Sequence, residues 1–184
     1  FSQRHLLTLQ DYSADEILQV LALALDLKQD LKDGLGFPPG KGPCSGQTLA
    51  MIFTKSSTRT RVSFETGFYQ LGGQAMFLSG NDIQLGRGEP IEDTARVLGR
   101  MVDGIMIRTF AHSDAKMLAQ YSGVPVINGL TDDYHPCQML ADLLTYYEHK
   151  GQLSGKWAFV GDGNNMAHSL LLGCSKLGID IAIA

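Results

Sequence analysis

Residues 48–61, TLAMIFTKSSTRTR, decide how the rest of the chain is interpreted. The first six of them are largely apolar and predict a short buried strand. They lead directly into a turn that is rich in hydroxyl and arginine side chains. A helical pattern follows, in which Phe64, Phe68 and Leu71 recur at i, i+4 and i+7 before a glycine pair. A strand that passes through a short turn into a helix is the repeating unit of a parallel α/β sheet.

The same alternation of apolar runs and helical spacing continues to the end of the chain. Ser13 and Glu16 predict a capping box at the start of a helix before the first strand. Pro136 is the predicted start of a later helix. We expect strands at 48–53, 74–78, 105–108, 124–127, 157–161 and 179–183. Strict alternation of this kind predicts parallel sheets that are covered by helices on both faces.

Two further helices are expected between the strands. Pro90 is the predicted start of one that carries Ile91 to Val102, and Ser113 is the predicted cap of another. The polar, glycine-containing stretch 148–156, EHKGQLSGK, is the best candidate for a domain boundary.

The predicted fold class is therefore α/β, with two domains that each have a parallel sheet flanked by helices. We expect the first domain at residues 1–148 and the start of a second at residues 149–184. The final IAIA reads as the middle of a strand. We therefore expect the second domain to be truncated after its second strand and the chain to be the N-terminal part of a longer protein.

Composition excludes several classes of function. The net charge of -4 argues against nucleic-acid binding, which relies on a broad basic surface. No apolar run approaches the roughly 20 residues of a membrane span, and the N-terminus has no pattern of a signal peptide. The three cysteines form no CxxC pair, which favours reduced thiols and a cytoplasmic location. We expect no metal site and no organic cofactor.

The turn at residues 54–61 has the chemistry of an anion site. It offers hydroxyl groups, free backbone N–H groups at a helix N-terminus and two guanidinium groups, all of which suit a phosphate dianion. It lacks the GxxxxGK[ST] spacing of a nucleotide-binding P-loop. The residues alone also allow a simpler interpretation, in which the turn is an ordinary helix cap with two solvated arginines.

Further polar residues are predicted at the same edge of the sheet. Arg108 ends the third predicted strand, and His135 follows the fourth, three residues before Gln138. In open α/β sheets, ligands bind at the carboxyl ends of the strands. We therefore expect one convergent polar site. A buried ion pair for Arg108 and a packed core histidine for His135 remain alternatives.

Two strings carry a resemblance to a known family. SSTRTRVSFE resembles the Ser-Thr-Arg-Thr-Arg motif of the aspartate and ornithine carbamoyltransferases, and DDYHPCQMLADLLT matches their His-Pro-x-Gln motif. The resemblance implies that Arg108 and His135 contact the carbonyl oxygen of carbamoyl phosphate, that Gln138 takes its NH2 group, and that Arg61 forms a structural ion pair. The implied phosphate ligands are Ser57, Thr58, Arg59 and Thr60.

The family resemblance also implies partners and an acceptor. Gln84 matches a loop residue that reaches the site of a neighbouring subunit, which implies a homotrimer or a multiple of trimers. GDGNN…HS near the C-terminus resembles the ornithine branch, in which Asn165 would bind the amino-acid end of L-ornithine. The GxGxxG pattern of dinucleotide folds is absent there, because Met166 occupies the third glycine position. His168 and Ser169 are equally interpretable as packing residues at the domain junction.

The implied reaction transfers the carbamoyl group to L-ornithine and yields L-citrulline and phosphate, in arginine synthesis or breakdown. Three alternatives remain open: the same chemistry on putrescine, on acylated ornithine or on aspartate. A non-catalytic phosphate-binding module is a fourth. We expect the 184 residues alone to bind carbamoyl phosphate but to be inactive.

Overall fold

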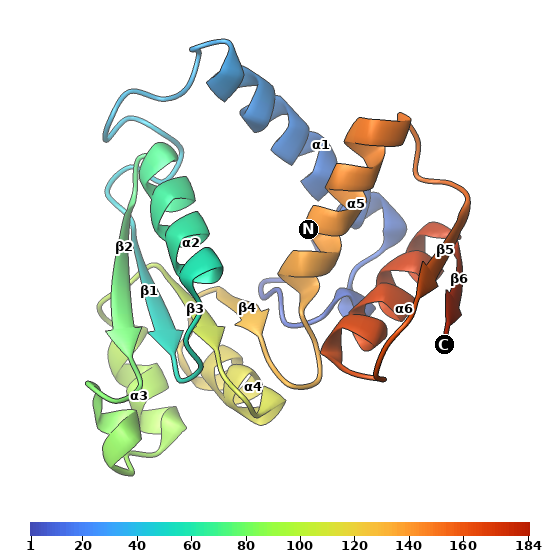
Figure 1. Cartoon of the computed structure of the whole chain (residues 1–184). Coiled ribbons are helices and arrows are strands. Elements are labelled where there is room, and N and C mark those ends of the chain that lie inside the picture. The colour runs from blue at the N-terminus through green and yellow to red at the C-terminus, as the bar shows by residue number, and fades with distance from the viewer.

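The strand at residues 48–53 forms the interior of a four-stranded parallel sheet. The computed structural model describes the backbone of residues 1–184 and the side chains of all of them except residues 86 and 87. The strand order is β2-β1-β3-β4, and the α/β class predicted from the sequence is confirmed (Figure 1). The strands are β1 (Thr48–Phe53), β2 (Gln74–Ser79), β3 (Gly104–Arg108) and β4 (Val126–Leu130).

Helices cover both faces of this sheet. Leu49, Met51 and Phe53 point to one face and pack against α2 (Thr58–Gln70). Alternate β1 residues point to the other face, towards α3 (Ile91–Leu98) and α4 (His112–Tyr121). This division follows from the two-residue period of a strand, which sends successive side chains to opposite faces. Because both faces are covered, the carboxyl ends of the strands are left as the accessible edge for a ligand.

Helix α1 (Ala14–Lys32) begins with the predicted capping box. The Glu16 N–H donates to Ser13 Oγ at 3.2 Å, and the Ser13 N–H donates to Glu16 Oε2 at 2.9 Å. Hydrogen bonds from the backbone N–H groups of Ser13 and Ser2 lower the pKa of Glu16 to about 2. At its other end, the helix is joined to α5 (Pro136–Lys150) by an ion pair between Lys28 and Glu148.

The C-terminal part of the chain forms a second, smaller parallel sheet. It pairs β5 (Lys156–Phe159) with β6 (Asp180–Ile183), and α6 (Asn165–Leu177) connects them. Residues of α1, α5 and α6 share one hydrophobic cluster, which includes Ile17, Leu143 and Leu170. Helix α5 therefore packs against both halves of the chain. The predicted boundary between residues 148 and 149 falls in the last turn of α5 and stays a prediction.

The fourth strand differs from its prediction at 124–127. It begins two residues later and continues through Gly129 to Leu130, with a bulge opposite β3 between Ile107 and Arg108. Glycine normally weakens a strand. Here a side chain at position 129 would place its Cβ atom 2.6 Å from Met106 Sδ. The strand passes too close to Met106 for any larger residue, which explains why a glycine lies inside it.

Two helix ends also differ from prediction. The helix expected to reach Val102 ends at Leu98. Gly99 follows it and lies against the Ser122 carbonyl, where a Cβ atom would come within 1.7 Å of the oxygen, so this position has room only for glycine. Ser113 is not a cap. Ala111 is the N-cap, and the helix begins at His112, two residues earlier than a cap at Ser113 would place it. The His112 ring is buried and hydrogen bonded to Thr131 Oγ1 at 3.1 Å.

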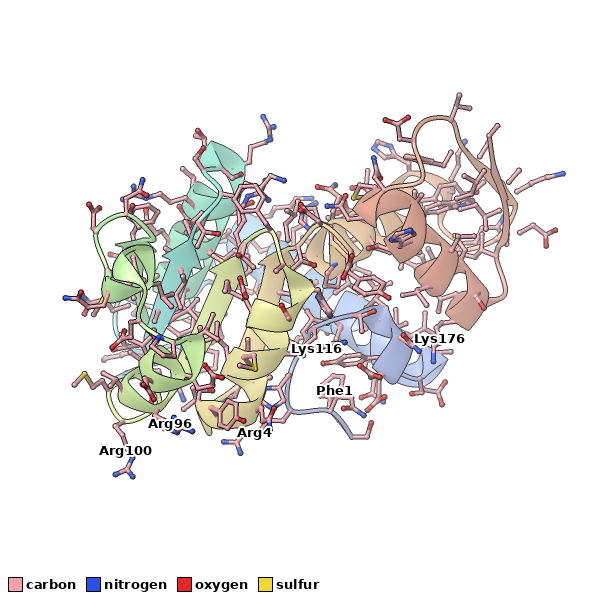
Figure 2. The ribbon with its side chains drawn as sticks, turned by 90° about the horizontal axis from the view of Figure 1, so that it is seen from below. Phe1, Arg4, Arg96, Arg100, Lys116 and Lys176 are labelled. Atoms are coloured by element: carbon pink, nitrogen blue, oxygen red, sulfur yellow. The ribbon has the colours of Figure 1, made fainter. Side chains whose placement is uncertain are left out.

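The N-terminal segment lies along the outer edge of β4. The Leu6 N–H donates to the Val126 carbonyl at 2.9 Å, and Leu6 accepts from Asn128 at 2.8 Å. Seen from below in Figure 2, Arg4 lies beside the end of α4, where it donates to the Gly123 carbonyl, and Arg100 points outward just after α3. No described helix has both the length and the apolar character needed to cross a membrane.

Candidate functional site

The turn between β1 and α2 is shaped by Ser57, which caps the helix. Its Oγ accepts from the Thr60 N–H at 3.3 Å and donates to Thr60 Oγ1 at 3.1 Å. Thr58 and Arg59 follow as exposed residues of the first helical turn. The first N–H groups of a helix have no partner within it and carry a partial positive charge. The turn therefore presents backbone donors and hydroxyl groups to the sheet edge.

Arg108 connects this turn to the neighbouring strand. Its carbonyl accepts from the N–H groups of Thr54 and Lys55 at 3.0 and 3.4 Å, which places the start of the turn beside the end of β3. Its Nη1 donates to Thr60 Oγ1 at 3.4 Å. Burial, and then the charge of Arg59, lower the pKa of the Arg108 guanidinium.

Two cations at the site have no counter-charge among the side chains that the structure describes. Among the described side chains, neither Arg59 nor Arg108 has a carboxylate within 4.0 Å, and Arg108 Nε is buried without a partner. Arg61 differs, because it pairs with Glu65 at 3.1 Å and lies over the Phe77 ring, as a structural residue would. A half-buried cation without a counter-ion is a strong attractor for an anion.

His135 stands at the start of α5, close to Arg108. Burial, and then the positive charge of Arg108, lower the pKa of its ring to about 4. The imidazole is therefore neutral near pH 7 and offers one N–H donor. Its Nδ1 is buried and has no hydrogen-bond partner among the described residues. The backbone N–H of His135 donates to Ser169 Oγ at 2.8 Å.

A cavity of about 210 Å³ lies between the first turns of α2 and α5. Four predicted site residues line it: Arg59, Thr60, His135 and Gln138. Gln138 is exposed, and its Nε2 donates to Asp142 at 2.9 Å, which leaves the amide oxygen available as an acceptor. A guanidinium, a hydroxyl group, an imidazole and an amide in one small lining suit a small polar anion.

Five predicted site residues are not among those that line this cavity. Ser57 and Thr58 directly precede Arg59, and Arg108 contacts Thr60. The other two are Gln84 and Asn165. Gln84 begins the 3₁₀ turn η2 (Gln84–Arg87), where it is exposed. Asn165 is the first residue of α6, and its Nδ2 donates to the Thr131 carbonyl at 2.7 Å. Its amide is thus directed at the loop before His135.

The structure adds two contacts that the sequence did not indicate. Lys55 Nζ lies 3.3 Å from Asp132 Oδ1 and so joins the anion turn to the loop before His135. Ser169, which the sequence left open as a packing residue, is 2% exposed and donates to the Asn165 carbonyl at 2.7 Å. A serine that bonds to the carbonyl four residues earlier is a common helix feature, so the pattern gave no sign of its contact with His135.

No candidate metal site appears within the described part of the chain, where no three His, Cys, Asp or Glu side chains are grouped so that they would hold an ion. Cys137 lines the cavity, but burial raises the pKa of its thiol to about 12, and its Sγ contacts the Asn128 carbonyl. It is therefore a neutral thiol and not a nucleophile at neutral pH. The ionic chemistry of the cavity comes from Arg59 in its lining and from Arg108, which contacts the lining residue Thr60.

Comparison with known proteins gives the same picture for most of the chain. The family model for the aspartate/ornithine carbamoyltransferase carbamoyl-P binding domain matches residues 4–148. An ornithine carbamoyltransferase from Carboxydothermus hydrogenoformans is 59% identical over 182 residues, which are 98% of this chain and 57% of the relative. One from Bacillus subtilis is 58% identical, and the match covers 54% of its length.

Solved structures agree with these relatives. The ornithine carbamoyltransferase of Pyrococcus furiosus superposes with a TM-score of 0.91 at 53% identity, over 98% of this chain and 56% of that chain. The enzyme from Thermus thermophilus superposes with a TM-score of 0.91 at 38% identity. The present chain therefore spans a little more than half the length of the proteins that it matches.

Proposed function

Because the chain belongs to the aspartate/ornithine carbamoyltransferase family, we propose that it is the part of such an enzyme that binds carbamoyl phosphate and presents it to L-ornithine. The products are L-citrulline and phosphate. The observation that carries the proposal is the convergence of Arg59, Thr60 and His135 on one cavity beside Arg108.

The phosphate end of the substrate is assigned to the anion turn. Ser57, Thr58, Arg59 and Thr60 supply hydroxyl groups, helix N–H groups and a guanidinium, and these donors match the oxygens of a dianion. The absence of a carboxylate near Arg59 among the described residues supports this assignment, since the phosphate would be its counter-ion.

The carbonyl end is assigned to Arg108, His135 and Gln138. When the ornithine amine attacks the carbonyl carbon, negative charge develops on the carbonyl oxygen. The Arg108 guanidinium and the neutral His135 ring would donate hydrogen bonds to that oxygen, and loss of one such donor costs about 10²–10³ in rate in other enzymes. The Gln138 amide oxygen accepts from the carbamoyl NH2.

The reaction then needs no base from the protein. The new C–N bond forms while the bond from the carbonyl carbon to the phosphate oxygen breaks. The amine proton passes to the departing phosphate, which is held next to the carbon. An alkyl amine has a pKa near 10, so the neutral amine must be the form that reacts. Placing the two substrates side by side supplies much of the acceleration.

The remaining parts of the proposal extend beyond this chain. Asn165 would bind the amino-acid end of ornithine. Gln84 would reach the site of a neighbouring subunit in a homotrimer, which is supported by its exposed position outside the cavity. Three free cysteines support a cytoplasmic location. The role would lie in arginine metabolism. This part of the proposal is supported by the names of the relatives, which are ornithine carbamoyltransferases.

A chimera tests the transfer reaction. Residues 1–184 are fused to the remaining part of the Carboxydothermus hydrogenoformans relative, and the product is incubated with carbamoyl phosphate and each of ornithine, aspartate, putrescine and N-acetylornithine. Citrulline formation that is abolished by His135→Ala supports the proposal. An inactive chimera that folds and assembles like the intact relative would contradict it.

The role of Asn165 is tested in the same chimera. Asn165→Ala should raise the KM for ornithine and leave the KM for carbamoyl phosphate unchanged. An equal rise in both values would place Asn165 in the support of the loop before His135 and not in the acceptor site.

A further inference from the structure

The loop that leads to His135 is held by the first turns of α6. Three hydrogen bonds join them, although the partners lie more than 30 residues apart in the sequence. They are Asn165 Nδ2 to the Thr131 carbonyl (2.7 Å), His168 Nδ1 with the Asp133 carbonyl (2.9 Å), and the His135 N–H to Ser169 Oγ (2.8 Å).

The contact of Ser169 differs from the other two because Ser169 is buried and because its partner is the backbone of His135 itself. Ser169 is 2% exposed, while Asn165 is half-buried and His168 is exposed. Its hydroxyl hydrogen is directed to the Asn165 carbonyl at 2.7 Å, so the oxygen is free to accept from His135. Because the site is buried, water cannot easily replace a lost acceptor, and the His135 N–H would be left unpaired.

The His135 ring has little else to orient it. Its Nδ1 has no partner among the described residues, and the side chain makes no capping bond to α5. The direction of the ring into the cavity therefore depends on the backbone of His135, and the Ser169 hydroxyl fixes that backbone at its N–H.

We propose that Ser169 is a positioning residue that holds His135 beside Arg108. Through this contact, helix α6 shapes the part of the site that would bind the carbonyl group of carbamoyl phosphate. This inference rests on the proposed function of His135. Ser169 itself does not touch the ligand. Its hydroxyl acts through the backbone of the residue that does.

Titration calorimetry of the 184-residue chain separates positioning from general stability. Ser169→Ala should bind carbamoyl phosphate about tenfold more weakly, the usual effect of leaving one buried N–H unpaired. Its affinity for inorganic phosphate should not change, because phosphate needs only the anion turn. Ser169→Cys keeps a weak acceptor, so its affinity for carbamoyl phosphate should lie between those of the unsubstituted chain and Ser169→Ala. Ser175→Ala, on the exposed side of the same helix, is the matched control and should bind both anions normally.

A second measurement is independent of the ligand. NMR titration of the His135 ring should show its pKa rising from about 4 towards 6.5 in Ser169→Ala, because a ring released from the cavity regains water. An unchanged ring pKa, or an equal loss of affinity for both anions, would overturn the positioning role.

The two proposals fail in different ways. If the unsubstituted chain does not prefer carbamoyl phosphate to phosphate, the proposed function fails. The ring titration in Ser169→Ala still decides whether Ser169 anchors His135.

Discussion

Arg108 and Thr60 meet across the gap between β3 and α2, with 3.4 Å between Nη1 and Oγ1. The acceptor is a neutral hydroxyl group, so the contact does not compensate the positive charge of the Arg108 guanidinium. Arg59 is close enough for its charge to lower the pKa of Arg108 further. Two cations brought together without a carboxylate are unfavourable in an empty protein. The arrangement is explained if an anion occupies the turn during function.

Arg59 should contribute to the binding of any phosphate. Arg59→Ala is expected to weaken inorganic phosphate and carbamoyl phosphate alike, by roughly 10- to 100-fold, because it removes a charge-assisted hydrogen bond. Arg100→Ala changes the net charge equally at an exposed position two residues after the end of α3 and should leave both affinities unchanged (Figure 2). If both variants lose the same affinity in a calorimetric titration, Arg59 contributes only through the net charge of the protein and not through direct contact with the anion.

Arg108 should add to the effect of burial in keeping the His135 ring neutral. The pKa of the His135 ring is lowered first by burial and then by the charge of Arg108. Arg108→Gln is therefore expected to raise that pKa only partly, because the burial remains. NMR titration of the ring measures the change, and a ring pKa that stays near 4 in the variant would show that burial alone sets it.

The stability of the chain should fall as the pH is lowered from about 6.5 to about 4. The unfolded His135 has an ordinary pKa near 6.5 and the folded one a pKa of about 4, so the unfolded state binds more protons in this window. Burial lowers the pKa values of His112 and His5 in the same direction. The urea midpoint of unfolding should change less steeply with pH across this window in His135→Asn than in the unsubstituted chain. An unchanged slope would mean that His135 is not buried as described.

Glycine substitutions should act with opposite signs at two positions. Gly129→Ala places a Cβ atom 2.6 Å from Met106 Sδ beside the cavity, and we expect a loss of about 1–3 kcal/mol from overpacking. Gly67→Ala lies inside α2 with no atom within 4 Å of the new Cβ, and we expect a gain of about 0.5–1 kcal/mol. Chemical denaturation of both variants measures the difference. A stable Gly129→Ala protein would require Met106 to have moved.

The sequence predicted the parts of the fold that depend on local patterns. The capping box at Ser13, the strand at 48–53 and the helix after Pro136 follow from neighbouring residues, and the structure contains all three. The fourth strand was predicted at 124–127 but runs from Val126 to Leu130. It includes Gly129, a residue that normally weakens a strand, and the need for glycine there depends on the distant Met106. A local pattern cannot contain that information.

The candidate site shows the same limit. Arg59 and His135 were predicted for one site because both follow strands of a parallel sheet, and they line one cavity. The contact between His135 and Ser169 was not predicted, because the two residues lie 34 positions apart in the sequence. They meet only when α6 packs beside α5. Long-range hydrogen bonds of this kind need the tertiary structure.

The decisive measurement is a calorimetric titration of the unsubstituted chain with carbamoyl phosphate and with inorganic phosphate. We expect carbamoyl phosphate to bind more tightly, because Arg108, His135 and Gln138 would contact its carbamoyl group in addition to the contacts that the anion turn makes with the phosphate. The advantage should disappear in His135→Ala, while the affinity for phosphate stays the same. Equal affinity of the unsubstituted chain for the two anions would rule out the proposed carbamoyl contacts and identify a simple phosphate-binding module.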